Sequence, residues 1–166
     1  MNIVGSGSIG VALLGWADLD GGAAFRASTA DNAVVALPTT SRESVFKINS
    51  TGNNDTALYF NSASTNIFGI SDYTLTSVGS NNTAVYIQNG AVKLSDTNSA
   101  GAANTINMSG GKKNVGIYTI APDALTTGAD ITITNSDSSV GIYSQNATTV
   151  TNSGDISVTG GSVKAI

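Results

Sequence analysis

The sequence repeats itself with a period of about 25 residues, and this repeat constrains the fold more than any other feature. Each unit is a short run of alternating apolar residues, a turn rich in Asn, Gly and Ser, and a second short run. The units are FKINSTGNNDTALYF from Phe46, YTLTSVGSNNTAVYI from Tyr73, INMSGGKKNVGIY from Ile106, ITITNSDSSVGIY from Ile131 and ISVTGGSVKAI from Ile156. The last three units are evenly spaced, and the longest interval separates Tyr73 from Ile106. A period of this length is typical of solenoid proteins.

A third, weaker run lies between the units, as in LTTGADI (125–131) and VTNSGDI (150–156). β-Branched and small polar residues dominate all three runs, which favours strands over helices. The sequence therefore predicts an all-β fold. We expect a right-handed parallel β-helix with about 25 residues and three short strands in each coil. Turns such as 50–54 and 80–82 are expected to stack Asn side chains in ladders, with a structural role.

Alternation along each strand predicts which side chains face the interior of the coil, because successive side chains point to opposite faces. In the first strand we expect inward columns at Phe46, Tyr73, Ile106, Ile131 and Ile156, and at Ile48, Leu75, Met108, Ile133 and Val158. In the second strand we expect them at Thr56, Thr83, Val115, Val140 and Val163, and at Leu58, Val85, Ile117, Ile142 and Ala165. The column between these two is expected to face outward; it holds Ala57, Ala84, Gly116, Gly141 and Lys164.

The repeat also divides the chain. Residues 46–166 form the regular coils, whereas residues 1–45 keep the strand rhythm without the register and are expected to be irregular first coils or an N-terminal cap. Extra residues around 95–103 predict a loop that leaves one coil. Because the last repeat stops in mid-pattern at Ile166, the chain is expected to be a fragment of a longer solenoid.

Composition excludes several kinds of site. The sequence has no Cys and no His, which rules out zinc fingers, disulfide frameworks and nucleophiles that depend on either residue. Seven basic residues are scattered against 11 acidic ones, so no nucleic-acid partner is expected. Apolar runs such as Val11–Leu14 are too short to span a bilayer. We expect no catalytic residue, no bound metal and no cofactor.

Three short motifs have structural explanations that we favour. Gly5, Gly7 and Gly10 match the G-x-G-x-x-G dinucleotide fingerprint, with Asp31 at the distance of the ribose ligand, but no βαβ pattern follows. Asp18 and Asp20 form only part of a calcium loop. Asn-x-Ser/Thr sequons, as at Asn54 and Asn146, are expected by chance in a chain with 17 Asn, 21 Ser and 20 Thr.

Two further patterns leave alternative functions open. Asp130 and Asp155 share a column, with Asp72 as the candidate third member, and clustered carboxylates are typical of β-helical polysaccharide-degrading enzymes. However, Asp is also common in turns before a strand. The outward pairs Thr74 with Thr76 and Thr132 with Thr134 resemble the Thr arrays of ice-binding solenoids, and phage-tail solenoids belong to the same alternative.

The remaining candidate is a column of aromatic residues formed by Tyr59, Tyr86, Tyr118 and Tyr143. We expect these rings to form a ladder on the outer surface of the coils. Such a ladder has two interpretations: a platform for sugar rings, or a stack that only stabilises the coils. The structural interpretation is the favoured one.

The units KNVGIYT (113–119), SSVGIYS (138–144), ITNSDSSVGIY (133–143) and VTNSGDISVTGGSVKAI (150–166) resemble the coils of fusobacterial large autotransporter adhesins, which use type V secretion. The resemblance is strong over about 104–166, fair over 46–90 and negligible before Phe46. It implies a passenger-domain β-helix that is exported through the outer membrane and displayed on the bacterial cell surface, monomeric within its longer chain. Such passengers attach to host cells or other bacteria through glycans or protein receptors, and no binding residue carries over because the shared motif is structural.

Overall fold

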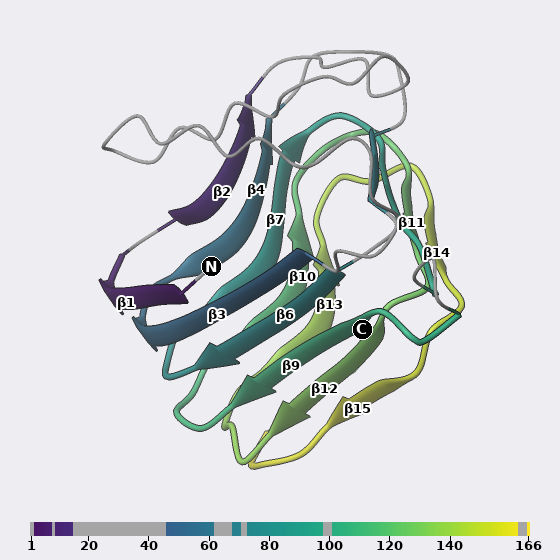
Figure 1. Cartoon of the computed structure of the whole chain (residues 1–166). Coiled ribbons are helices and arrows are strands. Elements are labelled where there is room, and N and C mark those ends of the chain that lie inside the picture. Colours follow the sequence, from purple (N-terminus) through teal and green to yellow (C-terminus); the bar gives the residue numbers. More distant parts are fainter. Residues whose placement is uncertain are drawn as a thin grey trace.

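The computed structural model describes residues 2–7, 9–14, 46–61, 68–70, 73–97, 101–162 and 166. All secondary structure in these residues is β-strand, and every strand pairs in parallel with the equivalent strand of the neighbouring coil. The predicted all-β parallel solenoid is therefore confirmed, with about four turns (Figure 1).

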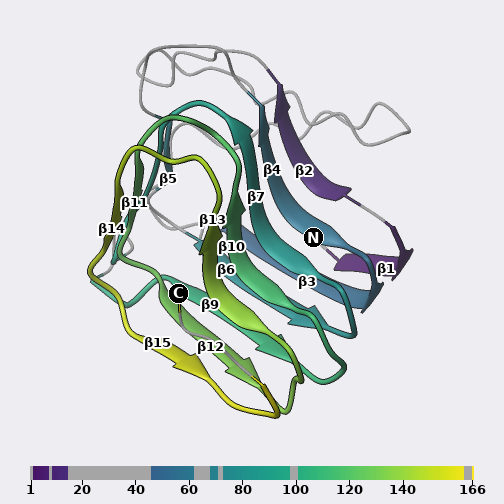
Figure 2. The same ribbon diagram turned by 180° about the vertical axis from the view of Figure 1, so that it is seen from behind.

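Three sheets form the walls of the solenoid, and a coil described in full gives one strand to each wall. Sheet 1 contains β1 (Asn2–Ser6), β3 (Phe46–Asn53), β6 (Tyr73–Val78), β9 (Thr105–Ser109), β12 (Asp130–Thr134) and β15 (Ile156–Val158). Sheet 2 contains β2 (Ile9–Leu14), β4 (Thr56–Asn61), β7 (Thr83–Asn89), β10 (Val115–Thr119) and β13 (Val140–Ser144). Sheet 3 contains β5 (Phe68–Ile70), β8 (Val92–Leu94), β11 (Leu125–Thr127) and β14 (Val150–Asn152). Figure 2 shows the strands of sheet 2 side by side along one wall.

The core is a stack of aliphatic side chains enclosed by the three walls. Ile48, Leu75, Ile106 and Ile131 lie beside one another from sheet 1, and Leu58, Val85, Ile117 and Ile142 do the same from sheet 2. All eight are buried. Fully burying one such side chain contributes about 1.5–3 kcal/mol, so each added coil extends a continuous apolar core.

The register between the second and third coils corrects the sequence alignment. The alignment placed Tyr73 opposite Ile106, but Leu75 pairs with Ile106 and Ser77 pairs with Met108. In sheet 1, paired positions of these two coils are thus separated by fewer residues than the sequence alignment assumed. A shift of two residues keeps the same side chains facing inward, so the apolar pattern alone did not distinguish the two registers.

The column of small residues in sheet 2 also corrects the sequence prediction. Ala57, Ala84, Gly116 and Gly141 were expected to face outward, but all four are buried. A Cβ atom added at Gly116 would lie 2.7 Å from Ile131 Cγ2, so this position faces the core. The pairing between neighbouring coils skips this column, and two successive residues in each strand are buried, from which we infer a local bend in the strands.

As a consequence of this bend, the column that precedes the small residues turns toward solvent. Its residues were expected to face inward but are half-buried: Thr56, Thr83, Val115 and Val140. The outer face of sheet 2 therefore carries this column in addition to the aromatic one. Val163, Lys164 and Ala165, the last expected members of the three columns, lie outside the described residues.

The N-terminal residues extend two of the walls. β1 pairs with β3 and β2 pairs with β4, which adds one strand to sheet 1 and one to sheet 2. Residues 15–45 lie outside the described part of the chain, so the expected irregular coils or cap at 1–45 stay a prediction.

A buried polar column stabilises the corner between sheets 1 and 2. The backbone N–H of Asp55 donates to Asn82 Oδ1 (2.9 Å), that of Asn82 to Asn114 Oδ1 (3.0 Å), and that of Asn114 to Ser139 Oγ (3.0 Å). Each side chain thus satisfies a backbone donor of the preceding coil, as buried polar groups require. The residue before each member has a positive φ: Asn54, Asn81, Lys113 and Ser138. Asn82 and Asn114 thus occupy the same corner of successive coils, but the bond between them joins a backbone N–H to a side chain, so the predicted stacking of Asn side chains stays a prediction.

The predicted loop near residue 95 is present between β8 and β9. Ten residues, 95–104, join these two strands, whereas Gly128 and Ala129 alone join β11 to β12. Thr97 and Ala103 pair as an antiparallel bridge at the base of the loop.

Candidate functional site

The candidate site is the aromatic ladder on the outer face of sheet 2. Tyr59 pairs with Tyr86, Tyr86 with Tyr118, and Tyr118 with Tyr143 in the parallel ladders of β4, β7, β10 and β13. The four rings therefore lie in one column, one per coil. At the N-terminal end of this column, Ala12 of β2 pairs with Tyr59.

Neighbouring rings contact one another along the whole column. The ring centroids of Tyr59 and Tyr86 are 5.4 Å apart, those of Tyr86 and Tyr118 are 5.1 Å apart, and those of Tyr118 and Tyr143 are 5.2 Å apart. The middle pair is stacked with an interplanar angle of 10°, and the outer pairs are tilted at 49° and 64°. Centroids at this separation are typical of offset stacks and edge contacts, which are worth about 0.5–1.5 kcal/mol per pair.

This geometry decides which aromatic surface is open to a ligand. Tyr59, Tyr86 and Tyr118 are half-buried, because each ring covers part of the face of the next. Tyr143 is 47% exposed, and Tyr118 is its ring partner among the described residues. The inner rings thus present edges and hydroxyl groups, while the largest open ring surface is at Tyr143.

Amide side chains flank the ladder at its N-terminal end. The Tyr59 hydroxyl donates to Gln88 Oε1, and Asn61 Nδ2 donates to the Tyr59 hydroxyl (3.4 Å). Asn89 Nδ2 donates to Asn61 Oδ1 (2.8 Å), which links the amides of two coils. These amides were not predicted from the sequence. The sequence does contain a signal for them, because in three coils an amide follows the tyrosine by two or three residues: Asn61, Gln88 with Asn89, and Gln145 with Asn146.

The described part of sheet 2 around the ladder is uncharged. The strands read TALYFN, TAVYIQN, VGIYT and VGIYS, without Asp, Glu, Lys or Arg. Partial burial, with smaller contributions from the Tyr118 and Tyr59 hydroxyls, raises the pKa of Tyr86. The phenol of Tyr86 is therefore neutral at physiological pH, as a hydrogen-bonding group for an uncharged ligand requires.

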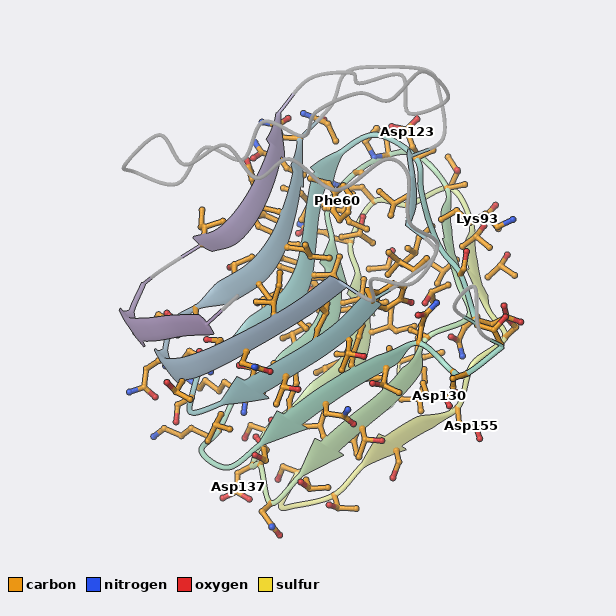
Figure 3. The ribbon with its side chains drawn as sticks, in the orientation of Figure 1. Phe60, Lys93, Asp123, Asp130, Asp137 and Asp155 are labelled. Atoms are coloured by element: carbon orange, nitrogen blue, oxygen red, sulfur yellow. The ribbon has the colours of Figure 1, made fainter. Side chains whose placement is uncertain are left out.

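The carboxylate column is also formed, and its contacts are within the fold. Asp130 and Asp155 lie at the same corner between sheets 3 and 1 (Figure 3). Asp130 Oδ1 accepts the backbone N–H of Asp155 at 3.1 Å, which joins two coils. Asp72, the third member expected, lies outside the described residues. Within the described residues, no group of three Asp or Glu side chains is arranged to hold a metal ion.

The structure places two glycines of the dinucleotide fingerprint on different strands. Gly5 lies in β1 and Gly10 in β2, so a strand follows the glycines where a dinucleotide site requires a helix. Asp18, Asp20 and Asp31 lie outside the described residues.

The Thr pairs are not aligned across the coils. Thr74 pairs with Thr105, whereas Thr132 pairs with Asn107 and through it with Thr76. The shift of two residues between the second and third coils thus displaces one Thr pair from the other.

In the described part of the chain, no helix is long and apolar enough to cross a membrane.

Comparisons with known proteins add no family assignment. No protein-family model, no curated protein and no solved structure matches the chain.

Proposed function

We propose that the chain is a structural and adhesive segment of a bacterial cell-surface protein, the passenger domain of an autotransporter adhesin. Two observations support the proposal. The repeat units resemble fusobacterial autotransporter coils, and the solenoid carries an uncharged aromatic ladder on one outer wall. The ladder is the observation that carries the adhesive function, because it is a solvent-facing array that the core does not need.

The proposed contact surface is the outer face of sheet 2, defined by the four ladder tyrosines and the amides Asn61, Gln88 and Asn89. The ligand that fits this chemistry is a neutral glycan. Sugar rings present C–H groups to aromatic surfaces and hydroxyl groups to amides and phenols, and they need no charged partner. We assign the sugar-contacting role to the ladder as a whole, because all four tyrosine rings lie in one column on this outer face.

The size of this surface favours a glycan over a folded protein receptor. Four strands spaced about 4.8 Å apart give a row of about 14 Å from the first tyrosine to the last. A stable protein–protein interface buries about 800 Å² on each partner, far more than one row of side chains supplies. Attachment through a protein receptor therefore requires more than this wall.

The test compares the folded chain with single variants for binding to immobilised neutral glycans and to whole bacterial and epithelial cells. Tyr143→Ala is expected to weaken binding at least tenfold, and Gln88→Ala is expected to weaken it less. Thr132→Ala on the outer face of sheet 1 is the matched control, because it removes a half-buried strand side chain from another wall.

The proposal has two clear ways to fail. If the folded chain binds neither glycans nor cells, the adhesive function is wrong for these residues. If Tyr143→Ala and Thr132→Ala bind equally well, the ladder is not the contact surface, and the stack serves only to stabilise the coils.

A further inference from the structure

The asparagines of the Asn-x-Ser/Thr sequons all lie on the surface of the solenoid. Five sequons occur in the sequence, and they begin at Asn49, Asn54, Asn81, Asn107 and Asn146. All five of these asparagines are exposed. In contrast, three asparagines that begin no sequon are buried in the walls: Asn82, Asn104 and Asn114. Exposure alone therefore leaves all five sequons open to modification, and their contacts must distinguish them.

Three of the five sequon asparagines are engaged in contacts. Asn107 Nδ2 donates to Thr105 Oγ1 (3.1 Å), and Asn146 Nδ2 donates to the carbonyl of Ile120 (3.2 Å). Asn49 also has an interaction partner. An amide nitrogen that already donates a hydrogen bond must give it up before it can enter an enzyme active site. These three sequons are therefore poor acceptors in the folded chain.

Asn54 and Asn81 differ from the other three because only their backbones are bonded. The backbone N–H of Asn54 donates to the carbonyl of Ser80 (2.9 Å), and that of Asn81 donates to the carbonyl of Lys112 (2.8 Å). Within the described residues, neither side-chain amide makes a hydrogen bond. The two asparagines occupy the same corner of successive coils, with φ of 62° and 57°. Two unengaged amide nitrogens are thus held side by side at this corner.

The third residue of each of these two sequons is also accessible. Thr56 and Thr83 pair with each other in the outer column of sheet 2 and are half-buried. The residues before them, Asp55 and Asn82, are buried and belong to the hydrogen-bonded column of the corner. The bend in sheet 2 therefore leaves the first and third residues of each sequon accessible, which are the two that define a glycosylation acceptor.

The threonine accompanies the asparagine from coil to coil. Four coils have both the corner residue and the strand residue two positions later within the described part of the chain. The pairs are Asn54 with Thr56, Asn81 with Thr83, Lys113 with Val115, and Ser138 with Val140. The strand residue is Thr where the corner residue is Asn, and Val where it is not. Because Val fits the same column, the fold itself does not require the hydroxyl group.

We propose that Asn54 and Asn81 are acceptor sites for N-linked glycosylation of the folded chain. The co-substrate is a nucleoside diphosphate sugar. Asn Nδ2 forms a bond to the anomeric carbon of the sugar and loses a proton. The bond from that carbon to the diphosphate oxygen breaks, and the nucleoside diphosphate leaves with the electron pair. The inference concerns modification of the chain and does not rest on the proposed adhesive function.

Incubation of the native chain with UDP-glucose and a soluble asparagine N-glucosyltransferase tests the proposal. Mass spectrometry of peptides measures the rate at which each sequon gains a hexose. Each rate is divided by that of a synthetic peptide with the same sequon, which removes the effect of local sequence. We expect the corrected rates at Asn54 and Asn81 to exceed those at Asn107 and Asn146 about tenfold, the order of the effect of one hydrogen bond.

Thr83→Val is the matched variant, because Val115 and Val140 show that this side chain fits the column. It is expected to abolish modification of Asn81 while Asn54 and the unfolding midpoint stay unchanged. Three results would overturn the proposal. These are equal corrected rates at Asn81 and Asn107, no hexose on native Asn81 although its peptide is modified, or continued modification of Asn81 in the variant.

Discussion

Ser50 of β3 lies beside Ser77 of β6 in the parallel ladder of sheet 1, yet the two buried hydroxyls differ in their hydrogen bonds. Ser50 Oγ donates to Asp55 Oδ2 at 2.7 Å. Ser77 Oγ has no hydrogen-bond partner among the described residues. The register explains the difference. Ser77 stacks between Ser50 and the apolar side chain of Met108, so it stands where the inward column changes from polar to apolar.

Substitution of these two serines is expected to have opposite outcomes. Ser50→Ala removes a donor to a buried carboxylate and is expected to lower the free energy of unfolding by about 1–3 kcal/mol. Ser77→Ala removes an unsatisfied hydroxyl and is expected to be neutral or stabilising. Urea unfolding of both variants measures the difference. Equal destabilisation would contradict the hydrogen-bond assignment.

Lys113 has the left-handed backbone conformation, with φ of 58°, at a turn position where the two preceding coils have Asn54 and Asn81. Asn and Gly adopt this conformation at lower cost than Lys. Lys113→Asn is therefore expected to raise the free energy of unfolding by about 1 kcal/mol. Lys112→Asn is the matched control, because it removes the same charge from the adjacent residue without relieving a positive φ. A gain of the same size in the control would attribute the effect to charge.

Gly116 has no space for a side chain. A Cβ atom there would lie 2.5 Å from the Gly141 carbonyl oxygen and 2.7 Å from Ile131 Cγ2. Gly116→Ala is expected to lower the free energy of unfolding by about 1–3 kcal/mol, because the backbone of the next coil must shift. Thermal unfolding checks this expectation, and an unchanged midpoint would show that the coils separate easily at this point.

The position of a tyrosine in the ladder is expected to set its contribution to stability. Tyr118 contacts the rings of both Tyr86 and Tyr143, whereas Tyr143 contacts Tyr118. Because each ring pair contributes about 0.5–1.5 kcal/mol, Tyr118→Ala should cost more stability than Tyr143→Ala. Denaturant unfolding of the two variants gives the comparison. The reverse order would mean that ring contacts are not what stabilises the outer wall.

Tyr73 is expected to make stability depend on alkaline pH. Burial, with smaller contributions from the carboxylates of Asp130 and Asp96, raises the pKa of Tyr73 far above its ordinary value. The unfolded chain loses this proton near pH 10, while the folded chain keeps it. The contribution of the Tyr73 phenol to the free energy of unfolding is therefore complete below about pH 10. Above that pH it falls by about 1.4 kcal/mol per pH unit. Tyr73→Phe should flatten the decline measured by urea unfolding between neutral and alkaline pH.

The fold was predictable because the chemistry repeats along the chain. Period-two alternation, turn residues and a regular repeat length together specify parallel coils, and the tyrosine column followed from the same alignment. Two details were not predictable. The register of Leu75 against Ile106 depends on how the extra residues are shared between the loop at 95–104 and the turn at 110–114, which the alternating pattern does not record.

The second unpredictable detail is the burial of Ala84 and Gly116. It depends on a bend that places two successive residues inward, and alternation assumes an unbent strand. A small residue is compatible with either face, so its identity did not reveal the bend. The buried Ala and Gly were therefore misread as an outer column, although the aromatic residue two positions later was placed correctly on the outside.

Since each of four successive coils contributes one tyrosine to the ladder, the number of such coils determines the number of rungs. Duplication of one repeat unit, such as 115–139, would lengthen the core and the aromatic row together. Valency is thus coupled to chain length: a surface that binds weakly at one rung gains avidity when the gene grows by whole repeats. Selection for tighter attachment can act on copy number without redesigning any single contact.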